Sequence, residues 1–164
     1  MALTRDILAS YRAPGAVLAR RLPGAKPEAR ALVTCVLACA LIFVAQWPRL
    51  AREAYYDPAI PFEARLGGAL LAWIFLAPLL LYAIAGISHL VARATGGRGS
   101  MFGARMALFW ALLAAAPLWL LHGLVAGFVG PGPALSAVGL VALAAFLIIW
   151  IAGLVRAERQ GTAT

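Results

Sequence analysis

Residues 106–129 read MALFWALLAAAPLWLLHGLVAGFV, and these 24 consecutive residues include no Asp, Glu, Lys or Arg. A helix of about 20 apolar residues is long enough to cross the hydrocarbon core of a bilayer. Within that core each backbone N–H and C=O group needs a partner from the protein, which an α-helix provides internally. The sequence therefore predicts that residues 106–129 form a transmembrane helix.

Three other segments have the same character, namely residues 31–47, 66–91 and 134–155. The first is near the lower length limit for a membrane span, and the second is long enough to tilt. Gly130-Pro131-Gly132-Pro133 separates the last two segments, and such a tight turn predicts an antiparallel helix pair. The expected fold class is all-α, a polytopic transmembrane bundle of four helices over residues 31–155.

The composition agrees with lipid as the surrounding solvent. Of the 164 residues 64% are hydrophobic and 12% are charged, whereas soluble domains are about one quarter charged. The net charge of +8 alone would allow nucleic-acid binding. The basic residues, however, gather at the ends of the apolar segments, where membrane proteins place them. We therefore expect a lipid bilayer, and no nucleic acid, as the partner.

The basic residues also predict the orientation. Eleven of them fall in residues 1–30, 92–105 and 156–164, and three fall in residues 48–65 and 130–133. Cytoplasmic loops carry the excess of Lys and Arg, so both termini are expected to be cytoplasmic, and residues 156–164 are expected to form a cytoplasmic tail. Lys26 is the only lysine, and this preference for arginine in a chain rich in Ala, Gly and Pro favours a bacterial protein of the inner membrane.

Residues 1–30 are predicted to form a cytoplasmic, amphipathic segment that lies on the membrane surface. On a helical wheel one arc of about 100° holds its apolar side chains. These are Ile7, Leu8, Tyr11, Leu18 and Leu22. Arginines outside the arc suit anionic lipid headgroups, and Pro14 is expected to split or kink the helix. The alternative is a basic flank that only directs topology. The arginines expected at the membrane surface, in this segment and in the 92–105 loop, are Arg5, Arg12, Arg20, Arg21 and Arg98.

Small residues recur at four-residue spacing in two of the predicted spans. One stripe is Ala31, Cys35 and Cys39, and the other is Gly123 and Gly127. Such stripes let another helix approach closely in a membrane, so these five residues are predicted to form helix-packing interfaces. A metal site at the two cysteines would need further ligands at that depth, and Thr34 and Gln46 are poor ligands. We expect no metal and no cofactor.

The two histidines, His89 and His122, are predicted to lie about 25 Å apart in depth, so one chain cannot clamp a haem between them. Hydrogen bonds to neighbouring helices are the expected role. Pro78 and Pro117 sit in similar contexts, as in transporters built from repeated broken helices, but apolar residues surround both. Glu53, Asp57 and Glu63 are expected to balance nearby arginines, with a divalent-ion site as the alternative.

The arginine-bearing lead-in, the segment Gly96-Gly97-Arg98-Gly99-Ser100-Met101-Phe102 and the helix with Pro117 resemble the bacterial branch of the YIP1 family. Members of that family are small polytopic membrane proteins, and this chain has four predicted spans where the family usually has five. The resemblance implies membrane organisation, since eukaryotic members act in vesicle trafficking and contact small GTPases. It transfers no site residue to this chain.

The predicted function is that of a non-enzymatic integral membrane protein, a scaffold, a membrane-organising protein or an accessory subunit of a membrane complex. Its expected partners are anionic lipid headgroups and either other membrane subunits or further copies of itself. A small transporter or channel is the alternative. No catalytic residues are assigned, because the four spans contain no ionisable side chain that could serve a relay or pump except the two histidines.

The orientation can be tested by cysteine accessibility in intact cells. Because Ser100 lies in the predicted cytoplasmic loop, a Ser100→Cys variant should resist a membrane-impermeant thiol reagent added outside and react after the cells are opened. Labelling from outside in intact cells would contradict the predicted orientation.

Overall fold

The computed structural model describes residues 2–22 and 27–160. Residues 23–26 of the predicted surface segment and residues 161–164 of the predicted tail lie outside the described residues. The described parts form only helices and their connections, with no strand. Four helical spans are long and apolar enough to cross a membrane, namely Glu28–Tyr56, Phe62–Ala94, Met101–Phe128 and Pro133–Arg159. The predicted fold class, an all-α four-helix transmembrane bundle, is confirmed.

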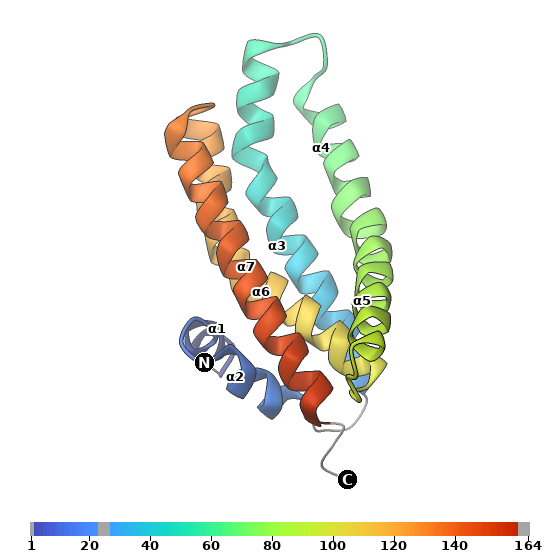
Figure 1. Cartoon of the computed structure of the whole chain (residues 1–164). Helices are drawn as coiled ribbons and strands as arrows, with labels where there is room; N and C mark the ends of the chain where they lie inside the picture. Colours follow the sequence, from blue (N-terminus) through green and yellow to red (C-terminus); the bar gives the residue numbers. More distant parts are fainter. Residues whose placement is uncertain (1, 23–26, 161–164) are drawn as a thin grey trace.

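The helices follow one another along the chain with short connections. Their bounds are α1 (Ala2–Ser10), α2 (Pro14–Arg21), α3 (Pro27–Tyr56), α4 (Phe62–Leu70), η1 (Leu71–Leu76), α5 (Ala77–Ala94), α6 (Met101–Phe128) and α7 (Pro133–Gln160). The start of α3, the end of α5, the start of α6 and the end of α7 gather at one end of the bundle, together with α2 (Figure 1). We call this the terminal end, and the opposite end, with residues 57–61 and 129–132, the far end.

Each span is longer than its apolar segment. Helix α3 runs on through Pro48 to Tyr56, so the connection to α4 is residues 57–61 and not the expected 48–65. The side chain of Leu50 is buried and Arg49 pairs with Glu53 one turn later at 3.2 Å, which supports this extension. Helix α7 likewise continues from residue 155 to Gln160, into the predicted tail.

Helix α6 is the centre of the bundle. It packs along α3 on one side and along α7 on another, and it also touches α5, α1 and α2. Of the 18 consecutive residues of α6 with the highest hydropathy, 56% are buried. For the corresponding residues of the Phe62–Ala94 span the share is 6%. The α4–η1–α5 span is therefore peripheral, and most of its surface is left for lipid or for another protein.

Both predicted packing stripes lie inside this chain. Ala31, Cys35 and Cys39 are fully buried in a core cluster that α6 also builds. A Cβ atom on Gly123 would lie 1.9 Å from the carbonyl oxygen of Ala45, and one on Gly127 would lie 2.4 Å from Cβ of Pro48. The two glycines thus allow α6 to contact the backbone of α3 directly, so their surfaces are not available to a partner protein.

Glycine also shapes both ends of the bundle. Gly96, at φ +94°, ends α5: its N–H donates to the carbonyl of Arg93, and the N–H of Gly97 donates to that of Ala92. At the far end Gly130 has φ +90°, and a Cβ there would meet the guanidinium of Arg52 at 2.6 Å. The same guanidinium donates to the carbonyl of Gly127 at 3.1 Å.

One segment of the second span is a π-helix, η1, in which the N–H of Ala77 bonds the carbonyl of Ala72. Pro78 follows at once and has no N–H to donate, and its ring would clash with the carbonyl four residues earlier in a regular α-helix. Widening by one residue is a known way to absorb such a defect. In α6, Pro117 is accommodated without a π-helical segment.

The N-terminal segment is divided at Pro14 into α1 and α2, which lie beside the terminal half of α7 on the side away from α5 (Figure 1). Asp6 joins the two helices by ion pairs to Arg20 at 3.0 Å and Arg21 at 2.6 Å. Val17 and Leu18 are buried against the bundle.

Polar side chains fix this segment to α6. Trp110 Nε1 donates to Ser10 Oγ at 2.9 Å, and the phenol of Tyr11 donates to the carbonyl of Ala114 at 2.9 Å. Partial burial raises the pKa of the Tyr11 phenol above its usual value. Of the predicted apolar arc, Ile7, Leu18 and Leu22 pack against the core, while Leu8 is 70% exposed. One part of the apolar arc therefore packs against the bundle, and the other part is exposed on the surface of the protein.

The contact between α6 and α3 predicts the effect of filling it. Gly123→Leu and Gly127→Leu should lower the stability of the folded chain by about 1–3 kcal/mol or more, because each added side chain meets the backbone of α3. The midpoint of thermal unfolding in mild detergent measures this. Gly86→Leu is the matched control, since nothing lies within 4 Å of an added Cβ there. Equal midpoints for Gly86→Leu and Gly123→Leu would contradict the packing.

Candidate functional site

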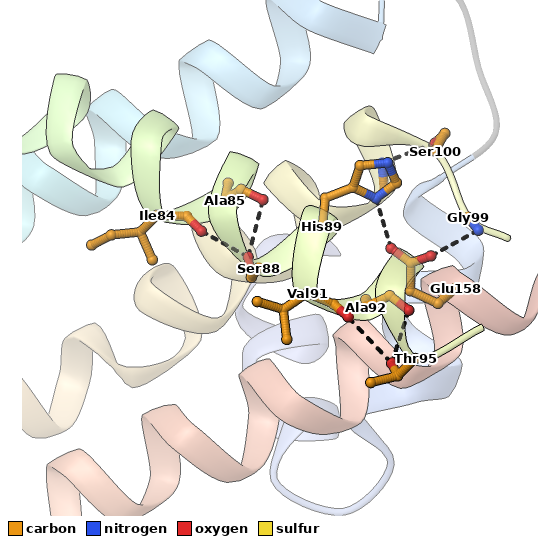
Figure 2. Close-up of polar contacts among 11 residues, drawn as sticks. Ile84, Ala85, Ser88, His89, Val91, Ala92, Thr95, Gly99, Ser100 and Glu158 are labelled. Carbon is orange, nitrogen blue, oxygen red and sulfur yellow. Dashed lines mark hydrogen bonds and ion pairs between the residues drawn. The ribbon is translucent and has the colours of Figure 1, made fainter. Parts of the chain in front are cut away.

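The most concentrated group of buried polar atoms lies at the terminal end, where α5, the 95–100 connection and α7 meet. His89 on α5 and Glu158 on α7 are 5% and 7% exposed. His89 Nδ1 and Glu158 Oε1 are 2.8 Å apart (Figure 2). An ionised carboxylate only accepts hydrogen bonds, so with Glu158 ionised His89 Nδ1 carries the proton. His89 and Glu158 are 69 residues apart in the sequence, and their contact joins two different spans.

The second carboxylate oxygen of Glu158 holds the connection. Oε2 accepts the N–H of Gly99 at 2.8 Å, and the main-chain carbonyl of Glu158 accepts the N–H of Arg98 at 3.3 Å. Figure 2 shows both carboxylate oxygens engaged, one toward His89 and the other toward Gly99. Glu158 therefore fixes the relative positions of α5, the connection and α7.

The glycines of this connection are needed for the contact. A Cβ on Gly97 would lie 2.7 Å from Glu158 Oε2 and 2.8 Å from the carbonyl of Ala92, and a Cβ on Gly99 would lie 2.7 Å from the carbonyl of Ala157. The sequence Gly96-Gly97-Arg98-Gly99 thus lets the backbone pass directly over the end of α7. The side chain of Arg98 stays exposed between the two glycines.

A groove of about 690 Å³ starts at this cluster and follows α5 and α7 into the apolar part of the bundle. Its inner part is lined by Ile84, Ile87, Val91, Trp150, Ile151 and Leu154. Its mouth is lined by Thr95, Gly96, Gly97, Glu158 and Arg159. The hydroxyls of Ser88 and Thr95 donate to carbonyls of their own helix (Figure 2), whereas the buried Nε1 of Trp150, a residue of the groove wall, has no acceptor among the described residues.

The arginines predicted at the membrane surface differ in their surroundings. Arg5, Arg12 and Arg98 are exposed, and Arg20 is exposed while paired with Asp6. Arg21 instead packs 3.7 Å from the centre of the Trp110 ring and pairs with Asp6, so its main contacts are within the protein.

A second polar group lies at the far end. Glu53 pairs with Arg49 at 3.2 Å and Arg65 at 3.5 Å, and Asp57 pairs with Arg65 at 2.8 Å. Two of the three acidic residues weighed as a divalent-ion site are thus paired with arginines, and Glu63 is exposed. Among the described residues no three His, Cys, Asp or Glu side chains are placed to hold a metal ion.

The two histidines occupy opposite halves of the bundle. The ring centroids of His122 and Trp119 are 5.7 Å apart. His122 also packs against Gly139 of α7, where an added Cβ would lie 3.2 Å from the imidazole ring.

Glu158 was not singled out from the sequence, which assigned it to a tail. The available signal was helical spacing, since residues 151, 154 and 158 fall on one face if α7 continues past Val155.

Compared with protein-family models, with curated proteins and with solved structures, the chain matches none of them.

Removal of the Glu158 carboxylate should release the 95–100 connection. Glu158→Ala leaves the imidazole of His89 and the N–H of Gly99 without this acceptor, at a cost of about 1.5–3 kcal/mol for each hydrogen bond to a charged group. Trypsin should then cut after Arg98 faster than in the unaltered protein. Glu63→Ala, at an exposed carboxylate of the far end, is the control, and equal cleavage rates in all three proteins would contradict the role of Glu158.

Proposed function

We propose that this integral membrane protein is a non-enzymatic scaffold, membrane-organising protein or accessory subunit that acts through an outward face of its α4–η1–α5 span. The observation that carries the proposal is the open space beside three glycines of this span. An added Cβ at Gly67, Gly68 or Gly86 would have nothing within 4 Å, whereas at Gly123 and Gly127 it would meet α3.

Glycine in a helix costs about 1 kcal/mol relative to alanine. The internal packing of this chain accounts for that cost at Gly123 and Gly127, because close contact with α3 requires them there. It does not account for it at Gly67, Gly68 and Gly86, which lie on the least buried span. In membranes a helix surface with small residues lets a second helix approach closely, which favours association by dispersion contacts. We therefore assign this face to a transmembrane helix of a partner subunit or of a second copy.

The orientation belongs to the same proposal. The terminal end, with ten basic residues in the described segments, faces the cytoplasm of a bacterial cell, and the exposed Arg5, Arg12, Arg20 and Arg98 contact anionic headgroups of the inner leaflet. The resemblance to the YIP1 family stays a prediction that fits a membrane-organising role.

The alternative, a small transporter or channel, requires polar groups along a path through the bilayer. The clusters of charged groups in the described residues lie at the two ends: Asp6, His89 and Glu158 with their partners at one, and Glu53 and Asp57 with theirs at the other. The segments around Pro78 and Pro117 pack with apolar neighbours such as Ala77, Leu81 and Ala116. These features favour the scaffold over the transporter.

Replacement of glycines with open space beside them tests the proposal. Gly68→Leu and Gly86→Leu should weaken self-association or co-purification of a partner about tenfold, since bulk forced into a close helix contact costs about 1–3 kcal/mol. The free energy of unfolding of the single chain should stay equal or rise, because leucine favours the helical conformation more than the glycine that it replaces. Energy transfer between labelled full-length chains in vesicles, and recovery of bound subunits in mild detergent, measure the two forms of association.

Ala144→Leu, at an exposed small residue of α7, is the matched control. If both glycine variants associate as strongly as the control, the α4–η1–α5 face is not the interface.

A further inference from the structure

The groove between α5 and α7 has a polarity gradient along its length. Its inner residues, such as Ile84, Ile87 and Ile151, belong to the apolar segments, and its mouth is made by Thr95, Gly97 and Arg159 beyond their ends. Helices α5 and α7 both pack on α6, so the groove is a furrow between two ridges of the bundle. A ligand that fits it must be apolar at one end and polar at the other.

The length of the groove matches one leaflet. Ile84 and Thr95 are eleven residues apart on α5, which is about 16 Å along a helix at ~1.5 Å per residue. The hydrocarbon core of a bilayer is about 30 Å thick, so half of it is about 15 Å. An acyl chain of a lipid whose headgroup lies at the mouth would therefore follow the groove over the full depth of its own leaflet.

The charge at the mouth selects the headgroup. Arg159 lines the mouth directly, and the backbone N–H of the exposed Arg98 donates to the main-chain carbonyl of Glu158, while the N–H of Gly99 donates to the Glu158 carboxylate. The one carboxylate among the lining residues of the mouth, Glu158, is occupied by His89 and Gly99. The two arginines outnumber this one carboxylate, which favours a negatively charged group, and guanidinium pairs well with phosphate oxygens.

From these three features we infer that the α5–α7 groove is a specific site for an acidic phospholipid, with one acyl chain along Ile84, Ile87 and Leu154 and its phosphate at Arg98 and Arg159. Glu158 acts as a positioning residue, because it holds the backbone on either side of Arg98 against α7.

The lipid site is distinct from the proposed subunit interface. On a helical wheel of α5, Gly86 lies about 170° from the centre of the groove-lining positions 84, 87, 88, 91, 92 and 95. A partner on the Gly86 side therefore leaves the groove open. The two proposals do not depend on each other, and either can fail alone.

The experiment uses the full chain purified in mild detergent and offered an equimolar mixture of palmitoyl-oleoyl phosphatidylglycerol and palmitoyl-oleoyl phosphatidylcholine. Native mass spectrometry then counts the lipids that each protein retains. The unaltered protein should retain one phosphatidylglycerol in preference to phosphatidylcholine. Arg98→Gln with Arg159→Gln should lower that preference about 25-fold, because each of the two basic side chains near an anionic surface contributes about a fivefold change.

Two further variants separate the site from general effects. Arg93→Gln with Arg156→Gln removes the same charge from exposed arginines that do not line the groove and should keep the preference. Ile87→Trp narrows the apolar part of the groove and should reduce retention of both lipids. Thermal unfolding of each variant confirms that it is folded.

The inference is overturned by an equal loss of preference in both arginine pairs, which would show only bulk attraction to the protein charge. It is equally overturned if the unaltered protein retains the two lipids alike. Retention of phosphatidylglycerol by Ile87→Trp at the level of the unaltered protein would place the lipid outside the groove. A groove closed by a second copy would appear as a dimer that retains no lipid, which also overturns it.

Discussion

The direct backbone contact between α6 and α3 is the feature on which the other elements depend. Lipid tails are as apolar as leucine, so no hydrophobic force drives helices together once they are in the bilayer, and close packing has to supply the attraction. At Gly123 and Gly127 the missing side chains let α6 reach the carbonyl of Ala45 and the ring of Pro48. With that pair fixed, α6 offers its other surfaces to α7 and to α5.

Charged side chains join the spans at both ends of the bundle, in addition to the contacts of Ser10 and Tyr11 with α6. At the far end Arg52 spans from α3 to the carbonyl of Gly127 and fills the space beside Gly130. At the terminal end Arg105 of α6 pairs with Glu28 of α3 at 2.6 Å, and Glu158 of α7 joins His89 of α5. A charge-assisted hydrogen bond is stronger where water is scarce. The contacts at each end therefore fix how far one helix can slide along its neighbour, which apolar packing alone would not do.

The sequence predicted the four spans because apolar length is a direct consequence of bilayer thickness, and the runs of 17–26 residues contain no charge. It also predicted small-residue stripes, but spacing alone does not distinguish a contact within the chain from one with a partner. The structure makes that distinction, because Gly123 of α6 lies directly against the carbonyl of Ala45 in α3 of the same chain. Helix ends were less predictable, since Pro48 and the charges after Val155 read as loop or tail while tertiary contacts keep both regions helical. The candidate site was hidden for that reason: Glu158 meets His89 only if α7 continues for another turn.

The asymmetry between the spans bears on function. A bundle built only to sit in the membrane would gain nothing from glycines on its least buried helix, because they weaken that helix without improving any internal contact. The chain nevertheless places Gly67, Gly68 and Gly86 there and keeps Gly123 and Gly127 for itself. The π-helical turn beside Pro78 lies on the same span, where it interrupts the regular α-helical hydrogen bonding. A helix with these two features is poorly suited to stabilise its own bundle and well suited to meet another helix, whereas α6 has the opposite character. A packed centre and a separate outer span would suit the scaffold role proposed above, because an interface on the outer span can form without loosening the fold that carries it.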